Sequence, residues 1–334
     1  MCQVSVVVPT YKHPELLQCC LNALIMQDFE PDEYEIIIVD DANCEETCQQ
    51  VLCWVQQVRT ERLTKQERMP MVCYIPVETS YHGPAIARNL GWKAARSPII
   101  AFTDDDCIPF PDWLTKGVEA FSTSQHIAAV SGRVIMPLPE TPTDYEYNAA
   151  HLETCEFVTA NCFYRRDVLL DMGGFDERFT MAWREDSDLF FTLLKHGKTY
   201  VCAPEVQVLH PVRPASWGVS IHQQRKSMFN ALLYKKHPTL YRERIQAAPP
   251  WHYYGIVLAL LMGMFGLIRR SELLMVSGFG LWGWFTARFC MHRLEHTSHA
   301  PSHIVEMIVT SVLIPPLAIF WRIVGMFKFR VPFL

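Results

Sequence analysis

Three consecutive aspartates, Asp104-Asp105-Asp106, are the residues of this sequence whose types and spacing best suit cation binding. They follow the run Ile99–Thr103, whose apolar, β-prone residues predict a buried strand. Adjacent carboxylates repel one another and raise each other's pKa unless a cation neutralises them. At the C-terminal end of a strand they would lie where open α/β sheets bind ligands. The three residues therefore predict a divalent-metal and nucleotide site; the alternative is a solvated acidic turn before a helix that starts near Asp112.

A second group of polar residues lies further along the chain. Glu185 and Asp186 open a predicted helix whose apolar face carries Leu189 and its neighbours. The helix dipole alone favours acidic residues at this position, and the functional alternative is a carboxylate held at a cleft as a general base. His210 follows the apolar run Val206–Leu209, where it is either a structural residue or a metal ligand.

The segments before the three aspartates alternate between strand and helix. Predicted strands at Val4–Val8, Tyr34–Val39, Val72–Val77 and Ile99–Thr103 are separated by helices at about Glu15–Met26, Glu45–Arg68 and Pro84–Ala95. This alternation with short loops predicts a parallel, Rossmann-like sheet with Pro9, Asp40 and Asp104 along one edge. The chain has neither the Gly-rich fingerprint of dinucleotide dehydrogenases nor the P-loop of kinases. Acidic strand ends instead indicate a nucleoside diphosphate held through its ribose, its base and a cation.

The second half of the soluble part is less regular. Strands are predicted at Ala128–Met136, Phe157–Phe163 and Val206–Leu209, with a short helix at Asp167–Met172 and another opened by Trp183–Asp188. Between the first two strands, the Pro- and Thr-rich segment Pro137–Tyr147 is predicted to be a long functional loop.

Composition narrows the function classes. The chain has 334 residues and a net charge of −5, and it lacks a dense Lys/Arg stripe, which argues against a nucleic-acid partner. Its twelve cysteines contain no C-x-x-C pair, so we expect reduced thiols and no zinc ribbon. The first predicted strand begins almost at Met1 without a signal peptide, so the soluble part is expected in the cytoplasm.

The C-terminal part is strongly apolar. Three stretches, Trp251–Ile268, Leu273–Met291 and Ile304–Phe327, are near the length that spans a bilayer. The sequence therefore predicts a soluble domain over 1–248 and a hydrophobic helical membrane-associated region over 249–334. Its topology stays open because Arg269 and Arg270, between the first two stretches, oppose the positive-inside tendency of a cytoplasmic enzyme. The alternative is a buried helical subdomain.

Several blocks in register resemble glycosyltransferase family 2, inverting enzymes of the GT-A fold, and specifically its membrane-associated bacterial type. The resemblance covers roughly residues 3–236 and rests on these blocks: VSVVVPTY from Val4, IIVDD from Ile37, GPAIARNLG from Gly83, FTDDDCIPFPDW from Phe102, TANCFYRR from Thr159, GGFDERF from Gly173 and EDSDL from Glu185. It implies an α/β GT-A fold with a nucleotide-binding half at 1–110 and an acceptor and catalytic half at 111–248.

The resemblance also implies roles for single residues. The residues around a nucleotide-sugar donor would be Pro9, Thr10, Tyr11, Asp41, Gly83, Arg88, Asn89, Asp104 and Asp105. Asp106, from the family's DxD region, would bind Mg²⁺ or Mn²⁺, with His210 as a further ligand. Asp186 would be the catalytic base, with Glu185 as the second choice. Which of Asp104 and Asp105 contacts the ribose is left open.

The implied reaction is metal-dependent, inverting transfer of one sugar, of the hexosyltransferase type, to a hydroxyl of a glycan or lipid-linked acceptor. The family's processive synthases carry Gln-x-x-Arg-Trp after the base, whereas this chain has Gln223-Gln224-Arg225-Lys226-Ser227. Single-sugar addition is therefore expected, in surface polysaccharide or glycolipid synthesis, at the cell inner membrane with the catalytic domain facing the cytoplasm. The alternatives are a nucleotide-sugar-binding protein with weak turnover, a processive synthase, and a nucleotidyltransferase, which would want a Gly-rich basic loop after the first strand.

Overall fold

The computed structural model of the chain describes residues 2–333. Contacts divide the chain into two compact units. The sheet unit consists of Met1–Pro137 and Leu152–Pro211, and the helical unit consists of Leu138–His151 and Val212–Leu334. The division does not fall at residue 248, the boundary predicted from the sequence. The helical unit already begins at Val212 and also includes the short segment Leu138–His151, because both pack with the C-terminal helices.

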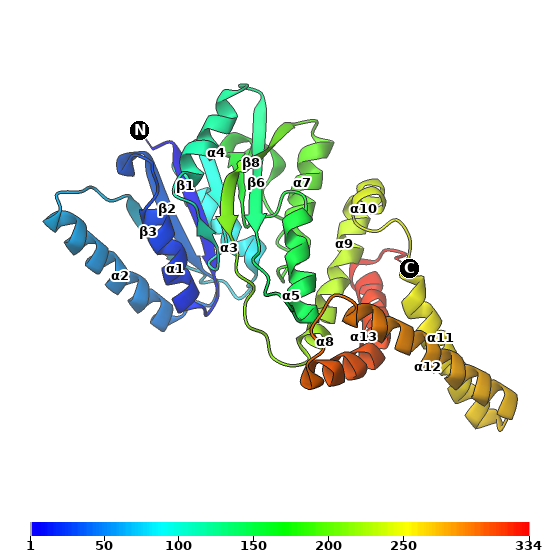
Figure 1. Cartoon of the computed structure of the whole chain (residues 1–334). Helices are drawn as coiled ribbons and strands as arrows, with labels where there is room; N and C mark the ends of the chain where they lie inside the picture. The colour runs from blue at the N-terminus through cyan, green and yellow to red at the C-terminus, as the bar shows by residue number, and fades with distance from the viewer. Residues whose placement is uncertain (1, 334) are drawn as a thin grey trace. The chain divides into compact units, whose positions relative to one another are not determined.

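The sheet unit contains one eight-stranded mixed sheet (Figure 1). In chain order its strands are β1 Val4–Thr10, β2 Tyr34–Asp40, β3 Met71–Pro76, β4 Ile99–Phe102, β5 Ile108–Pro109, β6 Ile127–Ile135, β7 Cys162–Arg165 and β8 Thr199–Leu209. In space they follow the order β3-β2-β1-β4-β7-β6-β8-β5. The pairs among β1 to β4 are parallel, and so is β6 with β8, whereas the pairs β4–β7, β6–β7 and β5–β8 are antiparallel. The predicted α/β architecture with a mainly parallel sheet is confirmed.

The parallel register brings the acidic strand ends together at one edge of the sheet. Thr10, the last residue of β1, is paired with Asp40, the last residue of β2. Val7 of β1 is paired with Phe102, so β4 ends beside β1 and the chain then enters the three aspartates. All seven residues of β2 are buried, as expected for a strand covered on both faces.

Helices cover both faces of the sheet. Those of the sheet unit are α1 Pro14–Ile25, α2 Glu45–Thr64, α3 Pro84–Ala94, α4 Trp113–Ser122, α6 Arg166–Met172 and α7 Glu185–Lys195. A Cβ on Gly91 of α3 would lie 2.3 Å from a methyl group of Val7, so α3 packs closely on the face that carries Val7. Trp113 of α4 packs on Phe163, whose register partner Ala101 is aligned with Val6. Because neighbouring residues of β1 face opposite ways, α3 and α4 lie on opposite faces.

Two predicted strands differ in length from those in the structure, one shorter and one longer. The strand predicted at Phe157–Phe163 is reduced to β7, and Phe157 has a positive φ of 56°. The buried Asn161 side chain donates to the carbonyls of Arg133 and Val206 and accepts from Trp113. These bonds hold the segment before β7 as a loop. By contrast, β8 is longer than the predicted Val206–Leu209 and begins at Thr199.

The helical unit begins with a helix where the sequence predicted a loop. Residues 144–149 form α5, Asp144–Ala149, because Thr143 and Glu146 form a reciprocal capping box that satisfies its first N–H groups. The other helices of this unit are α8 Val219–Gln223, α9 Phe229–Lys236, α10 Pro238–Arg244, α11 Trp251–Arg269, α12 Glu272–Leu294 and α13 Pro301–Phe329, and short 3₁₀ turns occur at Pro31–Glu33, Ala150–Thr154 and Gln224–Met228.

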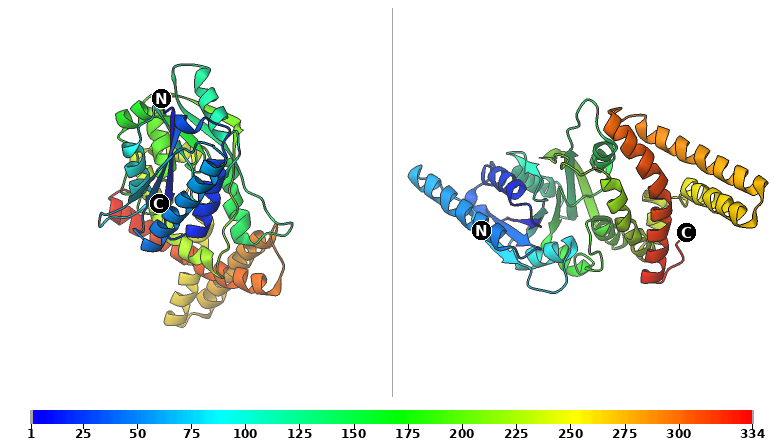
Figure 2. Two further views of the ribbon diagram at one scale, coloured as in Figure 1. Left: turned by 90° about the vertical axis from the view of Figure 1, so that its left-hand side faces the viewer. Right: turned by 90° about the horizontal axis from the view of Figure 1, so that it is seen from below.

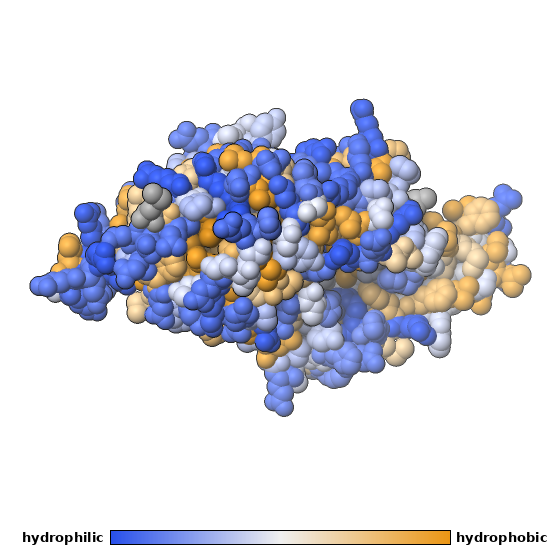
Figure 3. Space-filling model, turned by 90° about the horizontal axis from the view of Figure 1, so that it is seen from above, coloured by the Kyte–Doolittle hydropathy of each residue, from blue (hydrophilic) through white to orange (hydrophobic). Residues whose placement is uncertain are grey.

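Among the described residues, α11 and α13 are long and apolar enough to cross a membrane, with mean hydropathies of 1.6 and 2.0, whereas α12 does not reach this level. Figure 2 shows α11 and α12 side by side as a hairpin. Apolar side chains, including Leu261, Phe265 and Trp284, are exposed along it. Figure 3 shows orange, hydrophobic surface in the right-hand part of the view. The three predicted helices are thus present, and two of them have the length and hydropathy of a membrane-spanning helix.

Substitution of Gly91 by Ala tests the packing of α3 on the sheet. The new methyl group would overlap Val7, so we expect the free energy of unfolding to fall by about 1–3 kcal/mol, the cost of overpacking a core. Thermal unfolding of the full chain would measure it. The matched control is Gly280→Ala in α12, where a Cβ would meet nothing within 4 Å and helix propensity predicts a gain of up to about 1 kcal/mol. Equal effects of the two substitutions would contradict the packing.

Candidate active site

The three aspartates after β4 have three different partners. Asp105 is buried and accepts a hydrogen bond of 2.7 Å from the Thr10 hydroxyl at the end of β1. Asp104 forms an ion pair with Arg88, and Asp106 lies 3.6 Å from Nε2 of His210. The repulsion expected between adjacent carboxylates is therefore reduced by turning each side chain toward a different donor.

Arg88 of α3 joins the strand end to the start of α7. One terminal nitrogen lies 2.7 Å from Oδ1 of Asp104, and the other lies 3.0 Å from Oε1 of Glu185. The Arg88 side chain is only 4% exposed, so these bonds form away from water. Burial lowers the pKa of the guanidinium, but Asp104 and Glu185 outweigh burial and raise it overall, so the group stays charged.

The first turn of α7 holds two carboxylates in different environments. Arg184 adopts a left-handed conformation with φ 75° and turns the chain into the helix. Glu185 is buried, bonded to Arg88 and to the backbone N–H of Trp183. Asp186 is half-buried and accepts a 2.6 Å bond from the N–H of Ser187. Burial raises the pKa of both carboxyl groups, with Arg88 opposing this in Glu185 and the Ser187 N–H opposing it in Asp186.

The loop after β2 is held by its own aspartates. Asp40 is fully buried and accepts bonds from the N–H groups of Ala42 and Cys44 and from the Tyr74 hydroxyl. Asp41 accepts a 2.9 Å bond from the N–H of Gly83. The structure thus places Asp41 at the start of α3, and Asp40 inside the turn that carries it.

Gly83 and Asn89 have clear partners within the protein. Gly83 has φ 145°, and a Cβ there would lie 3.0 Å from the backbone of Thr180, so this position requires glycine for packing as well as conformation. The Asn89 amide donates to the carbonyl of Phe175 and to Glu177, and its oxygen accepts from Trp92. Asn89 therefore anchors the loop that begins at Gly173.

Pro9 and Tyr11 flank Thr10 and are more accessible. Pro9 is half-buried, and the Tyr11 ring is 51% exposed. Sequence reasoning overlooked His82, whose Nδ1 lies 2.7 Å from the carbonyl oxygen of Asp41. The sequence could have indicated His82 only through its position directly before Gly83, a predicted site residue.

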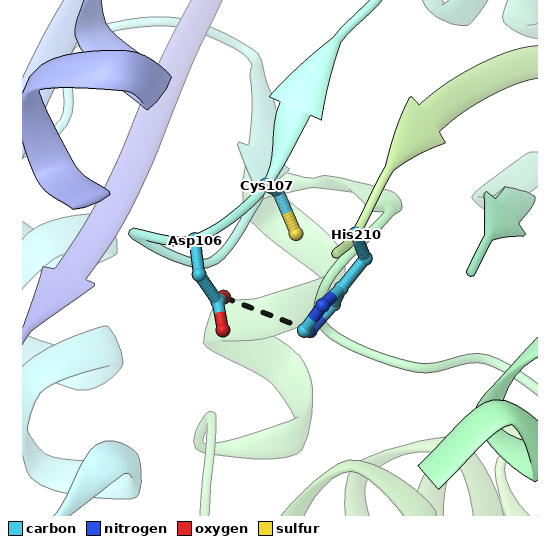
Figure 4. A group of neighbouring side chains, drawn as sticks. All are labelled: Asp106, Cys107 and His210. Atoms are coloured by element: carbon cyan, nitrogen blue, oxygen red, sulfur yellow. Dashed lines mark ion pairs between the residues drawn. The ribbon is translucent and has the colours of Figure 1, made fainter. Parts of the chain in front are cut away.

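Asp106, Cys107 and His210 form a cluster with the chemistry of a cation site. Figure 4 shows the three side chains converging, and their ligand atoms lie within 4.8 Å of one another. The cluster forms because β5 pairs with β8, Ile108 opposite Leu209, which brings the residue after β8 next to the residues before β5. Carboxylate and imidazole ligands suit a divalent cation such as Mn²⁺.

Cys107 was not among the predicted site residues, although it follows Asp106 directly. Its thiol is completely buried, and burial raises its pKa well above the ordinary value. A cysteine sulfur is in any case a soft ligand, whereas Mg²⁺ and Mn²⁺ prefer carboxylate and other oxygen ligands. The residues that fit Mg²⁺ or Mn²⁺ here are therefore Asp106 and His210.

Substitution of Arg88 by Met tests whether this arginine holds the site together. Asp104 and Glu185 would lose their shared counter-charge, and removing one member of a buried ion pair costs about 3–5 kcal/mol. Urea unfolding of the full chain would measure the loss. Arg178→Met is the matched control, because Arg178 is 57% exposed beside Asp176 and a surface pair contributes about 1 kcal/mol or less. A loss at Arg88 no larger than at Arg178 would contradict the bridging role.

Curated proteins similar to this chain include several glycosyltransferases. Glycosyltransferase AglE from Haloferax volcanii is 28% identical over 222 residues, which cover 63% of this chain and 67% of that protein. Validoxylamine A glucosyltransferase from Streptomyces hygroscopicus subsp. limoneus is 24% identical over 298 residues, covering 76% and 61%. Poly(ribitol-phosphate) beta-N-acetylglucosaminyltransferase TarS from Staphylococcus aureus is 27% identical over 216 residues, covering 63% and 34%. The matches thus span less than two thirds of the latter two relatives.

The chain is also similar to a solved glycosyltransferase structure and to two glycosyltransferase family models. Mannosyltransferase PcManGT from Pyrobaculum calidifontis, in complex with GDP-Man and Mn²⁺, superposes with a TM-score of 0.56 at 19% identity, covering 98% of this chain and 87% of that one, which supports the GT-A fold. The model of glycosyl transferase family group 2 matches residues 99–323. The model of glycosyl transferase family 2 matches residues 5–187, more than half of the sequence, and the chain therefore belongs to glycosyltransferase family 2.

Proposed function

We propose that the chain transfers one sugar from a nucleoside-diphosphate sugar to a hydroxyl acceptor, with inversion and with the help of a divalent cation. The observation that carries this proposal is the buried bridge of Arg88, which holds Asp104 opposite the first turn of α7. It brings the strand end that carries Asp104 and the proposed cation ligand Asp106 next to the helix start that carries the proposed base Asp186. PcManGT, which has a similar fold, is described in complex with GDP-Man and Mn²⁺.

The donor would lie along the carboxyl ends of β1, β2 and β4, the edge at which open α/β sheets bind nucleotides. Pro9, Thr10, Tyr11 and Asp41 would surround the base, because the exposed Tyr11 ring suits stacking and the Asp41 carboxylate can accept a bond from a base N–H. Of the two remaining aspartates, Asp104 is the better candidate for the ribose. Its side chain is 25% exposed, whereas Asp105 is buried against Thr10.

Arg88 supports the donor site indirectly. The resemblance places it beside the diphosphate, yet both of its terminal nitrogens are bonded to carboxylates. We therefore propose that Arg88 orients Asp104 and Glu185. Asn89 and Gly83 would act in the same way, by fixing the loops at Gly173 and Asp41.

Asp106 and His210 would hold Mg²⁺ or Mn²⁺. When bound, such a cation neutralises the negative charge that develops on a diphosphate leaving group. The softer Cys107 sulfur would lie beside this pair without serving as a ligand.

Asp186 would take the proton of the acceptor hydroxyl while that oxygen attacks the anomeric carbon. Attack from the face opposite the diphosphate inverts the configuration. Glu185 is less suited because its carboxylate is committed to Arg88 and to the N–H of Trp183. A raised pKa suits Asp186 to the role, since a stronger base accepts a proton more readily.

The apolar helices α11 and α13 support a proposal about location. We infer that they attach the chain to the cell inner membrane with the sheet unit on the cytoplasmic side, where a glycan or lipid-linked acceptor for surface polysaccharide or glycolipid synthesis would be met. The exposed apolar side chains of the α11–α12 hairpin would then face lipid.

Replacing Asp186 by Asn tests the base. We expect transfer to fall about a hundredfold or more, the scale of general-base catalysis, while donor binding by calorimetry stays unchanged. In the unsubstituted protein the rate should fall as pH drops through the raised pKa of Asp186, because protonation removes the base, and this limb should be absent in the variant. The exposed Asp171→Asn is the control. Unchanged turnover in Asp186→Asn would refute the assignment.

Replacing Asp106 by Asn tests the cation site. Electron paramagnetic resonance of added Mn²⁺ should show binding weakened by at least about tenfold, because even outer-shell partners contribute that much. Cys107→Ser is the matched control, since it changes a neighbouring side chain that we exclude as a ligand. Removal of metal with a chelator should abolish transfer. Weaker Mn²⁺ binding in Cys107→Ser alone would contradict this ligand set.

Membrane attachment can be tested by fractionation. We expect the chain to stay in the membrane fraction after an alkaline carbonate wash, because a spanning helix of apolar residues is not released by charge or pH. A peripheral protein from the same cells is the control. Release into the soluble fraction would exclude α11 and α13 as spans.

A further inference from the structure

The helical unit contains a pocket that none of the predicted site residues lines. Its volume is about 250 Å³, well above the roughly 10–15 Å³ that one water molecule requires. The start of α5, the segment 213–217, α8 and the start of α13 form its walls. Its charged and aromatic lining residues include Asp144, Glu146, Arg213, Trp217 and Glu306. The space suits one small polar molecule or one ring of a larger ligand.

The acidic wall of the pocket is rigidly built. Arg293 donates two hydrogen bonds to Asp144, of 2.6 and 3.2 Å, and both side chains are less than 10% exposed. The third nitrogen of Arg293 donates to the Thr310 hydroxyl at 2.6 Å. A bidentate pair of this kind fixes both partners in one geometry. Asp144 is thereby neutralised and held in place before any ligand arrives.

Glu306 of α13 is oriented by its neighbours. Its Oε1 accepts a 2.7 Å bond from the N–H of Gly218, and its Oε2 lies 3.5 Å from Nδ1 of His303. The other nitrogen of His303 lies 3.3 Å from the N–H of Asp144. These contacts link the two acidic residues through one buried imidazole and fix the carboxylate that lines the pocket.

Trp217 supplies a flat apolar surface beside these polar groups. The residue is 53% exposed, and its indole N–H donates to the carbonyl of Ser302 at 3.4 Å, which sets the direction of the ring. Large exposed aromatic rings held in this way favour ligands with an apolar face and a polar edge. A sugar ring has this form, with C–H groups on one face and hydroxyl donors around its edge.

The charge of the lining selects the class of ligand. Besides Asp144, whose charge Arg293 neutralises, the acidic residues Glu146 and Glu306 face the pocket against Arg213 from the lining. The excess of carboxylate disfavours phosphate and other anions and favours hydroxyl groups that donate hydrogen bonds. We propose that this pocket binds one neutral pyranose ring of a glycan, with the ring stacked on Trp217 and its hydroxyls bonded to Glu306.

Binding of a sugar ring in this pocket does not depend on the proposed sugar transfer. If the transferase activity proposed above is correct, the pocket identifies the acceptor as a saccharide chain or a saccharide-bearing lipid; that step alone rests on the proposed function. Binding of a ring outside the donor groups would then add affinity through a second point of attachment.

Fluorine NMR of the full chain labelled with 5-fluorotryptophan tests the proposal. The protein must be kept in a detergent without a sugar headgroup, since a maltoside would compete for the pocket. Trp217→Phe and Trp251→Phe identify the resonances of two exposed tryptophans, of which only Trp217 lines the pocket. The probes are the methyl glycosides of glucose, mannose, galactose and N-acetylglucosamine, with inorganic pyrophosphate as the anionic comparison.

We expect at least one glycoside to shift the Trp217 resonance saturably and to leave that of Trp251 unchanged. Glu306→Gln should weaken this binding by about tenfold through loss of a charged acceptor, while its amide oxygen can still accept from Gly218. Saturation transfer to the glycoside protons should be lost in Trp217→Ala.

The proposal is overturned if no glycoside shifts Trp217 at up to about 100 mM, well above a millimolar Kd. Equal shifts of Trp251, or a saturable shift by pyrophosphate alone, would also overturn it. Sugar transfer measured on the same preparation separates the two proposals. Transfer without glycoside binding refutes the pocket alone, and glycoside binding without transfer refutes the proposed function alone.

Discussion

The buried bridge made by Arg88 is the interaction on which the organisation of the sheet unit depends. One guanidinium binds Asp104 at the end of β4 and Glu185 at the start of α7, segments about eighty residues apart in the sequence. Without this cation, two carboxylates would share a poorly solvated region, which is unfavourable. The bridge therefore couples the charge of the site to the folding of the sheet. It also engages the Glu185 carboxylate, whereas the adjacent Asp186 is half-buried and has no bond to Arg88 among the contacts described.

Much of the sheet unit follows from sequence patterns. Apolar runs bounded by Pro or Asp placed β1, β2, β3 and β4 within one or two residues, because buried parallel strands have uninterrupted apolar sequences. The short β7 could not be predicted in this way, since the side-chain bonds of Asn161 decide that its preceding residues form a loop. The helix α5 could have been predicted, because Thr143 and Glu146 have the spacing of a capping box.

The sequence predicted which residues of the candidate site lie close together, but it did not predict their individual hydrogen bonds and ion pairs. Thr10, the three aspartates, Glu185 and His210 are brought together because strand ends meet at one edge of the sheet. The partners of Arg88 and Asn89 were not predictable, because they come from α7 and from the loop at Gly173, whose positions depend on tertiary packing. Cys107 could be identified as part of the cation cluster only through the pairing of β5 with β8.

The ion pair between Asp144 and Arg293 joins two parts of the helical unit that are far apart in the sequence. Asp144 lies between β6 and β7 in the sequence, inside the stretch that otherwise builds the sheet, yet its buried counter-charge comes from the end of α12. The backbone passes between the two units three times, at residues 137, 151 and 211. Loss of the C-terminal helices would leave a buried carboxylate unpaired within the remaining chain. Exchange of residues 212–334 alone would therefore separate Asp144 from its counter-charge, although both residues belong to the helical unit.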